Sequence, residues 1–262
     1  MRQVNRAAIP VPNALDQDLS QETQAVVAGV SPKSAIYAHV TVKSALRDLY
    51  RENCYLCEDG TGASGEVEHF QPWRTFPNLA YEWTNLHNSC GPCNGRKRKK
   101  EYKDENGFTL LLDPSQPPAG ETIPGLIGFD ETGDAHARKD PVAVVVQRTV
   151  YFLNDPTPHG RRLKRINNLA WYIAERACLP EWRDMLDNGI TAPDQVAPER
   201  QAARLAALEA ADGVVDTYFR MSQPFASGVR ESFERRFGIP GSHLRAMSNR
   251  YRNWRGLPPL PA

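Results

Sequence analysis

Apolar residues recur at helical spacing in several stretches of the chain, and these stretches predict most of its elements. The first stretch runs from Ser34 to Arg51 and leads directly into a pair of cysteines. Further amphipathic helices are expected from Arg161 onward, between Leu205 and Phe219, and over FASGVRESFERRFG. Pro240 interrupts the pattern before another helical stretch, HLRAMSNRYRNW, and the final LPPLPA is expected to be extended.

Runs rich in β-branched and aromatic residues predict short strands in the middle of the chain. GFTLLLDP is expected to form a strand, and LIGFDETGDAHAR is expected to form two strands joined by a turn at ETGD. VAVVVQRTVYFLN fits either another strand or the start of a buried helix, because periodicity does not separate the two in a short apolar run. The pattern as a whole predicts a mainly helical α+β protein.

The same pattern divides the chain into three segments. Residues 1–32 are polar and marked by prolines, and we expect them to form an arm laid over the body. Residues 33–110 contain the first helix and a short, irregular, motif-dense region. Residues 111–262 are mixed at first and then mainly helical, without an internal repeat or a long linker.

Composition and charge exclude a uniformly basic nucleic-acid-binding protein and a membrane-spanning one. The 262 residues carry a net charge of only +1, so any affinity for phosphate must come from local patches. No apolar run approaches the roughly 20 residues of a membrane span, and the N-terminal MRQVNRAAIPVP lacks the apolar core of a signal peptide. We therefore expect a cytoplasmic protein with no membrane contact.

Four of the five cysteines form two C-x-x-C pairs, Cys54 with Cys57 and Cys90 with Cys93. In a reducing compartment such pairs are more often metal ligands than disulfides, and four thiolates suit one structural zinc ion. Cys178 lies alone in an apolar helical pattern and is expected to be a small buried hydrophobe.

The insert between the two pairs holds the candidate chemistry. Glu68 and His69 are adjacent, so one could bind a metal while the other acts on substrate; a hydrogen-bonded structural imidazole is the alternative for His69. His87 could touch phosphate or pack in a turn. The aromatic residues of the insert could stack on bases or pack in the core of the zinc module: Trp73, Tyr81 and Trp83.

A block of five positive charges follows the second cysteine pair. Alone, such a run is usually a solvent-exposed surface with no specific role. Beside a phosphodiester-cleaving site, it could instead bind the phosphates of the nucleic-acid backbone. Its members are Arg96, Lys97, Arg98, Lys99 and Lys100.

Taken in order, these motifs resemble the HNH endonuclease family in its four-cysteine form. The strings VEHFQP, FPNLAYEWTNL and SCGPCNGRK, with the N-terminal VNRAAIPVPNAL, are most similar to the HNH proteins of retrons and of Septu-type phage-defence operons. The core of the resemblance covers about Cys54 to Lys100. It implies a ββα-metal fold in which zinc joins the ends of the motif.

The resemblance also implies a role for each matched residue. His69 corresponds to the general base that activates water, and Glu68 and Asn94 correspond to ligands of a catalytic Mg²⁺ or Mn²⁺. Asn85 would orient the base through the loop backbone or assist at the metal. The chain departs from the common pattern in having Glu where Asp is frequent and Asn where the last residue is often His, which favours a weaker, hard-ion site.

The expected function is a metal-dependent endonuclease that cuts DNA as the effector of a phage-defence assembly. The family association implies an ATPase partner and, for the retron form, a reverse transcriptase with its RNA-linked DNA. The helical C-terminal region would contact that partner, or would only bury the zinc module. The alternative is a non-catalytic zinc module that binds nucleic acid or a protein.

Overall fold

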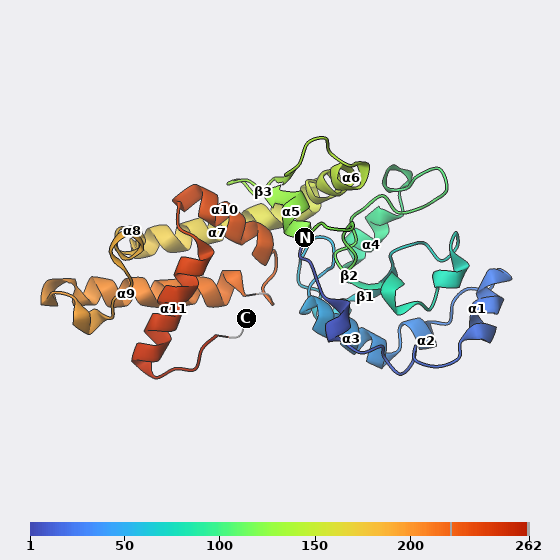
Figure 1. Cartoon of the computed structure of the whole chain (residues 1–262), viewed down its shortest axis with the longest axis horizontal. Helices are drawn as coiled ribbons and strands as arrows, with labels where there is room; N and C mark the ends of the chain where they lie inside the picture. Colours follow the sequence, from blue (N-terminus) through green and yellow to red (C-terminus); the bar gives the residue numbers. More distant parts are fainter. Residues whose placement is uncertain (221, 261–262) are drawn as a thin grey trace. The chain divides into compact units, whose positions relative to one another are not determined.

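The structure is a computed structural model that describes residues 1–220 and 222–260 (Figure 1). Antiparallel pairing joins strands Glu66–His69 (β1) and Leu86–Ser89 (β2), and a second small sheet joins Ile127–Phe129 (β3) and Ala135–Ala137 (β4). The prediction of a mainly helical α+β fold is confirmed. The α-helices are Ser20–Val27 (α1), Ser34–Tyr37 (α2), Val40–Tyr50 (α3), Gly91–Lys97 (α4), Ile123–Leu126 (α5), Val144–Leu153 (α6), Pro156–Arg176 (α7), Leu179–Asn188 (α8), Pro198–Val214 (α9), Ala226–Phe237 (α10) and Gly241–Arg255 (α11).

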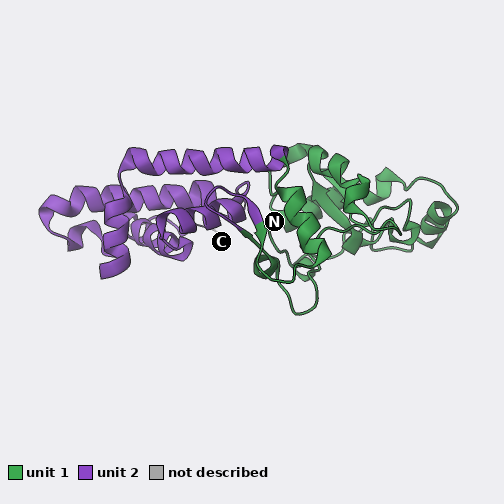
Figure 2. Ribbon diagram, turned by 90° about the horizontal axis from the view of Figure 1, so that it is seen from above, with its two compact units in different colours: residues 1–128, 136–155 green, residues 129–135, 156–262 purple. Residues whose placement is uncertain are grey.

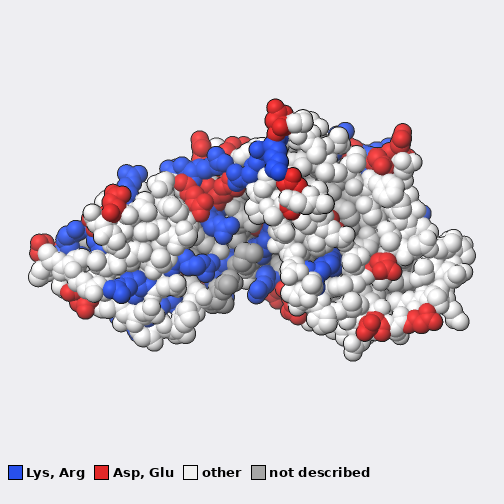
Figure 3. Space-filling model, viewed as in Figure 1, with Lys and Arg blue, Asp and Glu red and all other residues white. Residues whose placement is uncertain are grey.

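The chain forms two compact units, coloured separately in Figure 2. Unit 1 contains residues 1–128 and 136–155, and unit 2 contains residues 129–135 and the chain from Pro156 onward. The functional division into an arm (1–32), a nuclease module (33–110) and a partner-binding region (111–262) stays a prediction. On the face shown in Figure 3, acidic and basic side chains are scattered among uncharged ones.

In unit 1, α3 and α4 pack against the β1–β2 hairpin. The sequence predicts an apolar stripe of Ile36, Val40, Val42, Leu46 and Leu49, of which α3 buries the last three, whereas Val40 is 70% exposed. The expected single helix from Ser34 to Arg51 is divided, because His39 has an extended backbone and its Nδ1 accepts the Thr41 N–H at 3.3 Å. This side chain satisfies an N–H group that would otherwise lack a partner at the start of α3.

In the middle of the chain, one strand prediction is wrong, and the segment that fitted either a strand or a helix is helical. Within the described residues, GFTLLLDP forms no strand beyond a single bridge between Thr109 and Lys103. Side chains take some of its backbone donors instead: the Thr109 N–H bonds Gln71 Oε1 at 2.9 Å and the Leu112 N–H bonds Thr149 Oγ1 at 2.8 Å, whereas the Leu110 N–H bonds the Tyr102 carbonyl at 2.8 Å. VAVVVQRTVYFLN is helical, the second of the two structures that its pattern allows, and the hairpin at ETGD is confirmed.

Unit 2 is a helical assembly in which α9 packs against α7, α8 and α11. A π-helical turn, Val215–Phe219 (η7), extends α9 and packs against α10 and α11. Trp182 is fully buried and its indole N–H donates to the Ala207 carbonyl at 2.7 Å. Cys178 is 3% exposed, which confirms that it packs as a small hydrophobe, and burial raises its pKa to about 11. No helix in the described part of the chain has the length and apolar character needed to cross a membrane.

Candidate metal centre and pocket

The two C-x-x-C pairs meet in one buried cluster. Cys54 and Cys57 lie in the loop after α3, Cys90 is the N-cap of α4, and Cys93 lies within α4. The four sulfurs all lie within 4.8 Å of one another. The Sγ atoms of Cys57 and Cys90 are 3.8 Å apart, and a tetrahedron with Zn–S bonds of about 2.3 Å has edges of about 3.8 Å. Four thiol ligands at this spacing fit a structural zinc ion.

This cluster joins the two ends of the ββα segment. One cysteine pair precedes β1 and the other begins the helix that follows β2, so an ion held by all four would tie the start of the motif to its end. The loop is also fixed by its backbone, because the Tyr55 N–H donates to the Asn88 carbonyl at 2.8 Å. The arrangement holds β1 and α4 together at the neighbouring pocket.

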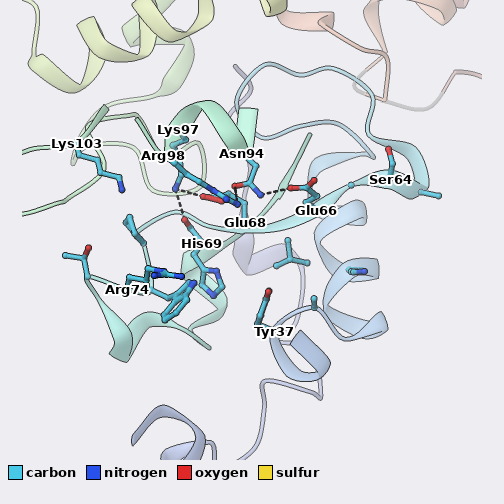
Figure 4. A pocket seen from close by; sticks show the side chains of 18 residues that line it. Tyr37, Ser64, Glu66, Glu68, His69, Arg74, Asn94, Lys97, Arg98 and Lys103 are labelled. Carbon is cyan, nitrogen blue, oxygen red and sulfur yellow. Dashed lines mark hydrogen bonds and ion pairs between the residues drawn. The ribbon is translucent and has the colours of Figure 1, made fainter. Parts of the chain in front are cut away.

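A pocket of about 930 Å³ lies beside β1 and α4. Figure 4 shows acidic, basic and aromatic side chains from several segments around it. It brings together three of the four predicted catalytic residues, Glu68, His69 and Asn94, whereas Asn85 does not line it.

His69 is held with one ring nitrogen engaged. Its Nε2 lies 2.8 Å from the Ala80 carbonyl oxygen, which can only accept a hydrogen bond, so the proton is assigned to Nε2 and Nδ1 is left as an acceptor. The ring of Tyr37 packs against the imidazole with the centroids 4.8 Å apart. Burial lowers the pKa of His69 to about 4, so the imidazole is neutral at neutral pH. A neutral imidazole with a free Nδ1 is able to accept a proton from water.

Asn85 acts on the loop that holds this histidine. Its Oδ1 accepts the Gln71 N–H at 2.7 Å, and its Nδ2 donates to the carbonyls of Gln71 and Leu79 at 3.1 and 3.0 Å. Leu79 directly precedes Ala80, whose carbonyl accepts the hydrogen bond from His69 Nε2. The geometry therefore corresponds to orientation of the base through the loop backbone, the first of the two roles that the resemblance implies for Asn85.

Glu68 and Asn94 border the pocket from β1 and α4, and each already has a partner. Asn94 donates Nδ2 to Glu66 Oε2 at 2.6 Å, which leaves its Oδ1 with one long contact, 3.3 Å from an Arg98 nitrogen. Glu68 is 6% exposed and pairs with Lys97 at 2.6 Å. Burial raises the pKa of Glu68 and lowers that of Lys97, although each charge stabilises the other.

The five-residue basic run is not one exposed face. Lys97 is 2% exposed, and its Nζ lies 2.6 Å from each of three acceptors, Glu68 and the carbonyls of His69 and Phe70. Arg96 is half-buried and pairs with Asp155, so these two side chains face inward. The prediction is corrected accordingly: the residues of the run with exposed side chains are Arg98, Lys99 and Lys100.

Replacing Lys97 with methionine should destabilise unit 1 strongly. The change removes the donor to the Glu68 carboxylate and to the His69 and Phe70 carbonyls, of which the Phe70 carbonyl keeps the Thr109 hydroxyl. Removal of one partner of a buried ion pair typically costs about 3–5 kcal/mol. Denaturant unfolding of the wild-type protein and the variant would measure the change. Adding Glu68→Gln should recover part of the loss. Equal stability of Lys97→Met and wild type would show that the pair is not formed.

The exposed fractions of the second histidine and of the aromatic residues in the insert show which of them pack in the core and which reach the pocket. His87 is fully buried and its Nδ1 lies 2.6 Å from the Tyr50 hydroxyl, so it packs inside unit 1 and does not reach phosphate. Tyr81 and Trp83 are 6% and 8% exposed, and both belong to the core. Trp73 is half-buried and borders the pocket.

Two residues in contact with the predicted catalytic set, Glu66 and Tyr37, are not among those that the sequence predicts. Glu66 lies two positions before Glu68, and the period of two along a strand places both side chains on one face, so alternation alone would have found it. Tyr37 reaches His69 from a separate helix more than 30 residues earlier, and no spacing rule in the sequence connects them.

Comparison with known proteins gives two related sequences. The chain is 32% identical over 105 residues to a Septu protein PtuB of Bacillus thuringiensis, a match that covers 39% of this chain and 41% of that protein. It is 28% identical over 102 residues to a Septu protein PtuB of Bacillus mycoides strain KBAB4, covering 33% and 35%. The chain thus spans less than half the length of these curated relatives. No protein-family model matches it.

Proposed function

We propose that this protein is a metal-dependent HNH endonuclease that hydrolyses phosphodiester bonds of DNA. One observation carries the proposal. His69 is a neutral imidazole whose Nε2 donates to the Ala80 carbonyl, and it lies in the same pocket as Glu68 and Asn94. A histidine with only a structural, hydrogen-bonding role would not need a carboxylate and an amide beside it in a pocket. A base beside hard oxygen ligands supplies the two requirements of phosphodiester hydrolysis.

In the proposed reaction, His69 Nδ1 accepts a proton from the attacking water. The Ala80 carbonyl fixes the tautomer, and Asn85 holds the same loop by donating to the carbonyl of the preceding residue, Leu79. Tyr37 packs on the imidazole and limits its rotation. These contacts orient the base before substrate arrives, which is the condition for efficient proton transfer.

The donors in the pocket fit a hard divalent cation. Glu68 and Asn94 would hold Mg²⁺ or Mn²⁺ through carboxylate and amide oxygens, and Glu66 orients Asn94 by accepting its Nδ2–H group. When bound, the ion would neutralise charge that develops on the phosphate. The Lys97 ammonium pairs with one oxygen of Glu68, which fixes the carboxylate and opposes the rise in its pKa that burial causes.

We further propose a role in anti-phage defence, with an ATPase as partner. The Septu names of the two relatives support this form over the retron form, which would add a reverse transcriptase with its RNA-linked DNA. Unit 2 contains none of the proposed catalytic residues, and we assign the partner contact to it. Exposed Arg98, Lys99 and Lys100 are assigned to the DNA backbone.

Supercoiled plasmid is the substrate that tests this proposal. The purified protein, with and without the products of the neighbouring genes, should convert plasmid to open-circular and linear forms with Mg²⁺ or Mn²⁺, and EDTA should stop the reaction. Parallel reactions with RNA would show which nucleic acid is cut. Plasmid that is bound but stays supercoiled under every condition would favour a non-catalytic zinc module.

A further inference from the structure

Three basic side chains far apart in the sequence line the same pocket as His69. Lys43 comes from α3, Arg74 from the loop after β1, and Lys103 from the segment after the basic run. Figure 4 labels Arg74 and Lys103 among the side chains around the pocket, with Arg74 on the side of His69. Among the residues that the structure describes, none of the three forms an ion pair with a carboxylate.

The lining of the pocket carries an excess of positive charge that the whole chain lacks. Its basic members are Lys43, Arg74, Lys97, Arg98 and Lys103, and its acidic members are Glu66 and Glu68. Pairing of Lys97 with Glu68 removes one charge of each sign and leaves the excess unchanged. The net charge of the chain is only +1, so positive charge is concentrated at this pocket. A concentrated positive field attracts a polyanion and raises its rate of association.

The aromatic side chains of the pocket are already engaged by protein groups. Tyr37 packs on His69, and the Arg74 guanidinium lies 5.0 Å from the centroid of the Trp73 ring. Stacking on Trp73 orients the planar guanidinium, which leaves its N–H groups available for an anion. The basic side chains of the pocket therefore remain available to a ligand. Contacts of basic side chains with phosphates do not depend on base sequence.

We propose that Lys43, Arg74 and Lys103 bind backbone phosphates of the DNA strand that passes His69. This inference rests on the proposed function. It gives the three residues a role in binding the DNA substrate that does not depend on base sequence. Lys43 and Lys103 act as point charges, whereas Arg74 offers a fixed fork for one phosphate. Together they would hold the strand against the pocket.

The test measures DNA binding by a protein that does not cut. On a His69→Ala background, Lys43, Arg74 and Lys103 are all changed to glutamine. Anisotropy of a fluorescein-labelled duplex of about 20 base pairs then gives binding constants over a range of salt concentrations. Loss of three phosphate contacts should flatten the slope of log K against log salt by about 2 to 3. Melting curves would confirm that the variant is folded.

A matched control changes the same charge elsewhere in unit 1. Lys33, Lys139 and Arg148 do not line the pocket, and their exchange for glutamine should leave the slope unchanged. Arg74→Gln alone alters one exposed side chain and should flatten the slope by about 1. An unchanged slope in the triple variant, an equal change in the control, or no binding by the His69→Ala parent would overturn the inference. Because binding is measured without cleavage, a failure of the nuclease proposal would appear separately, in the plasmid reaction.

Discussion

Replacing His69 with alanine is expected to reduce plasmid cleavage by about 100-fold or more, the usual scale for loss of a general base. The change removes the Nδ1 acceptor and the donor to the Ala80 carbonyl. It removes no zinc ligand, because the four thiols belong to other segments. The variant should therefore keep its zinc and its DNA binding, with a stability loss of about 1–3 kcal/mol from the unpaired carbonyl. Initial nicking rates at saturating Mg²⁺ would measure the effect.

The control for this variant is a histidine of unit 1 outside the pocket. His136 is half-buried in β4, and His136→Ala should cleave within a small factor of the wild-type rate. If His69→Ala cleaved as fast as the wild type, the imidazole would be a structural group and the protein would be better described as a zinc-dependent binding module.

Removal of zinc is expected to have the largest effect on folding. Binding of zinc to four thiolates in small zinc domains contributes about 10–16 kcal/mol, and this free energy is also folding free energy. A strong chelator, or Cys54→Ser with Cys93→Ser, should unfold at least residues 50–100, because both ends of the ββα segment depend on the cluster. Elemental analysis should find one zinc per chain in wild-type protein, and circular dichroism should report the loss of structure.

Cys178 provides the internal control for the zinc prediction. It lies in unit 2 and is absent from the four-sulfur cluster, so Cys178→Ala should keep one zinc per chain. Folded, untagged wild-type protein without zinc would refute the site.

Local rules were enough for the main helices of the C-terminal half and for the cysteine cluster, but not for α1 or for the division between α2 and α3. The apolar stripe that α3 buries, Val42, Leu46 and Leu49, repeats at helical spacing, and paired C-x-x-C turns impose their own geometry. GFTLLLDP does not form a strand, because its apolar residues pack within unit 1 while side chains of Gln71 and Thr149 take the backbone donors of Thr109 and Leu112. A hydrophobic pattern indicates burial, and it does not reveal which partner a backbone group will find.

The residues that surround the predicted site were less accessible from the sequence. Lys97 belongs to what the sequence presents as an exposed cationic block, yet it turns inward because Glu68 and two carbonyls provide three acceptors. Tyr37, Lys43, Arg74 and Lys103 reach the pocket from four segments, and only the tertiary fold brings them together. Local spacing therefore singled out Glu68, His69 and Asn94, which line one pocket, but not the basic residues that line it with them.

The most direct test of the central claim is the response of three variants to added Mn²⁺ in the plasmid assay. Glu68→Ala and Asn94→Ala should lose cleavage and partly recover as Mn²⁺ rises, since mass action refills a weakened metal site. His69→Ala should not recover at any concentration, because more metal does not replace a proton acceptor. That difference is the result we predict. Equal recovery of all three variants, or wild-type cleavage by His69→Ala without added Mn²⁺, would contradict the assignment of base and metal ligands in this pocket.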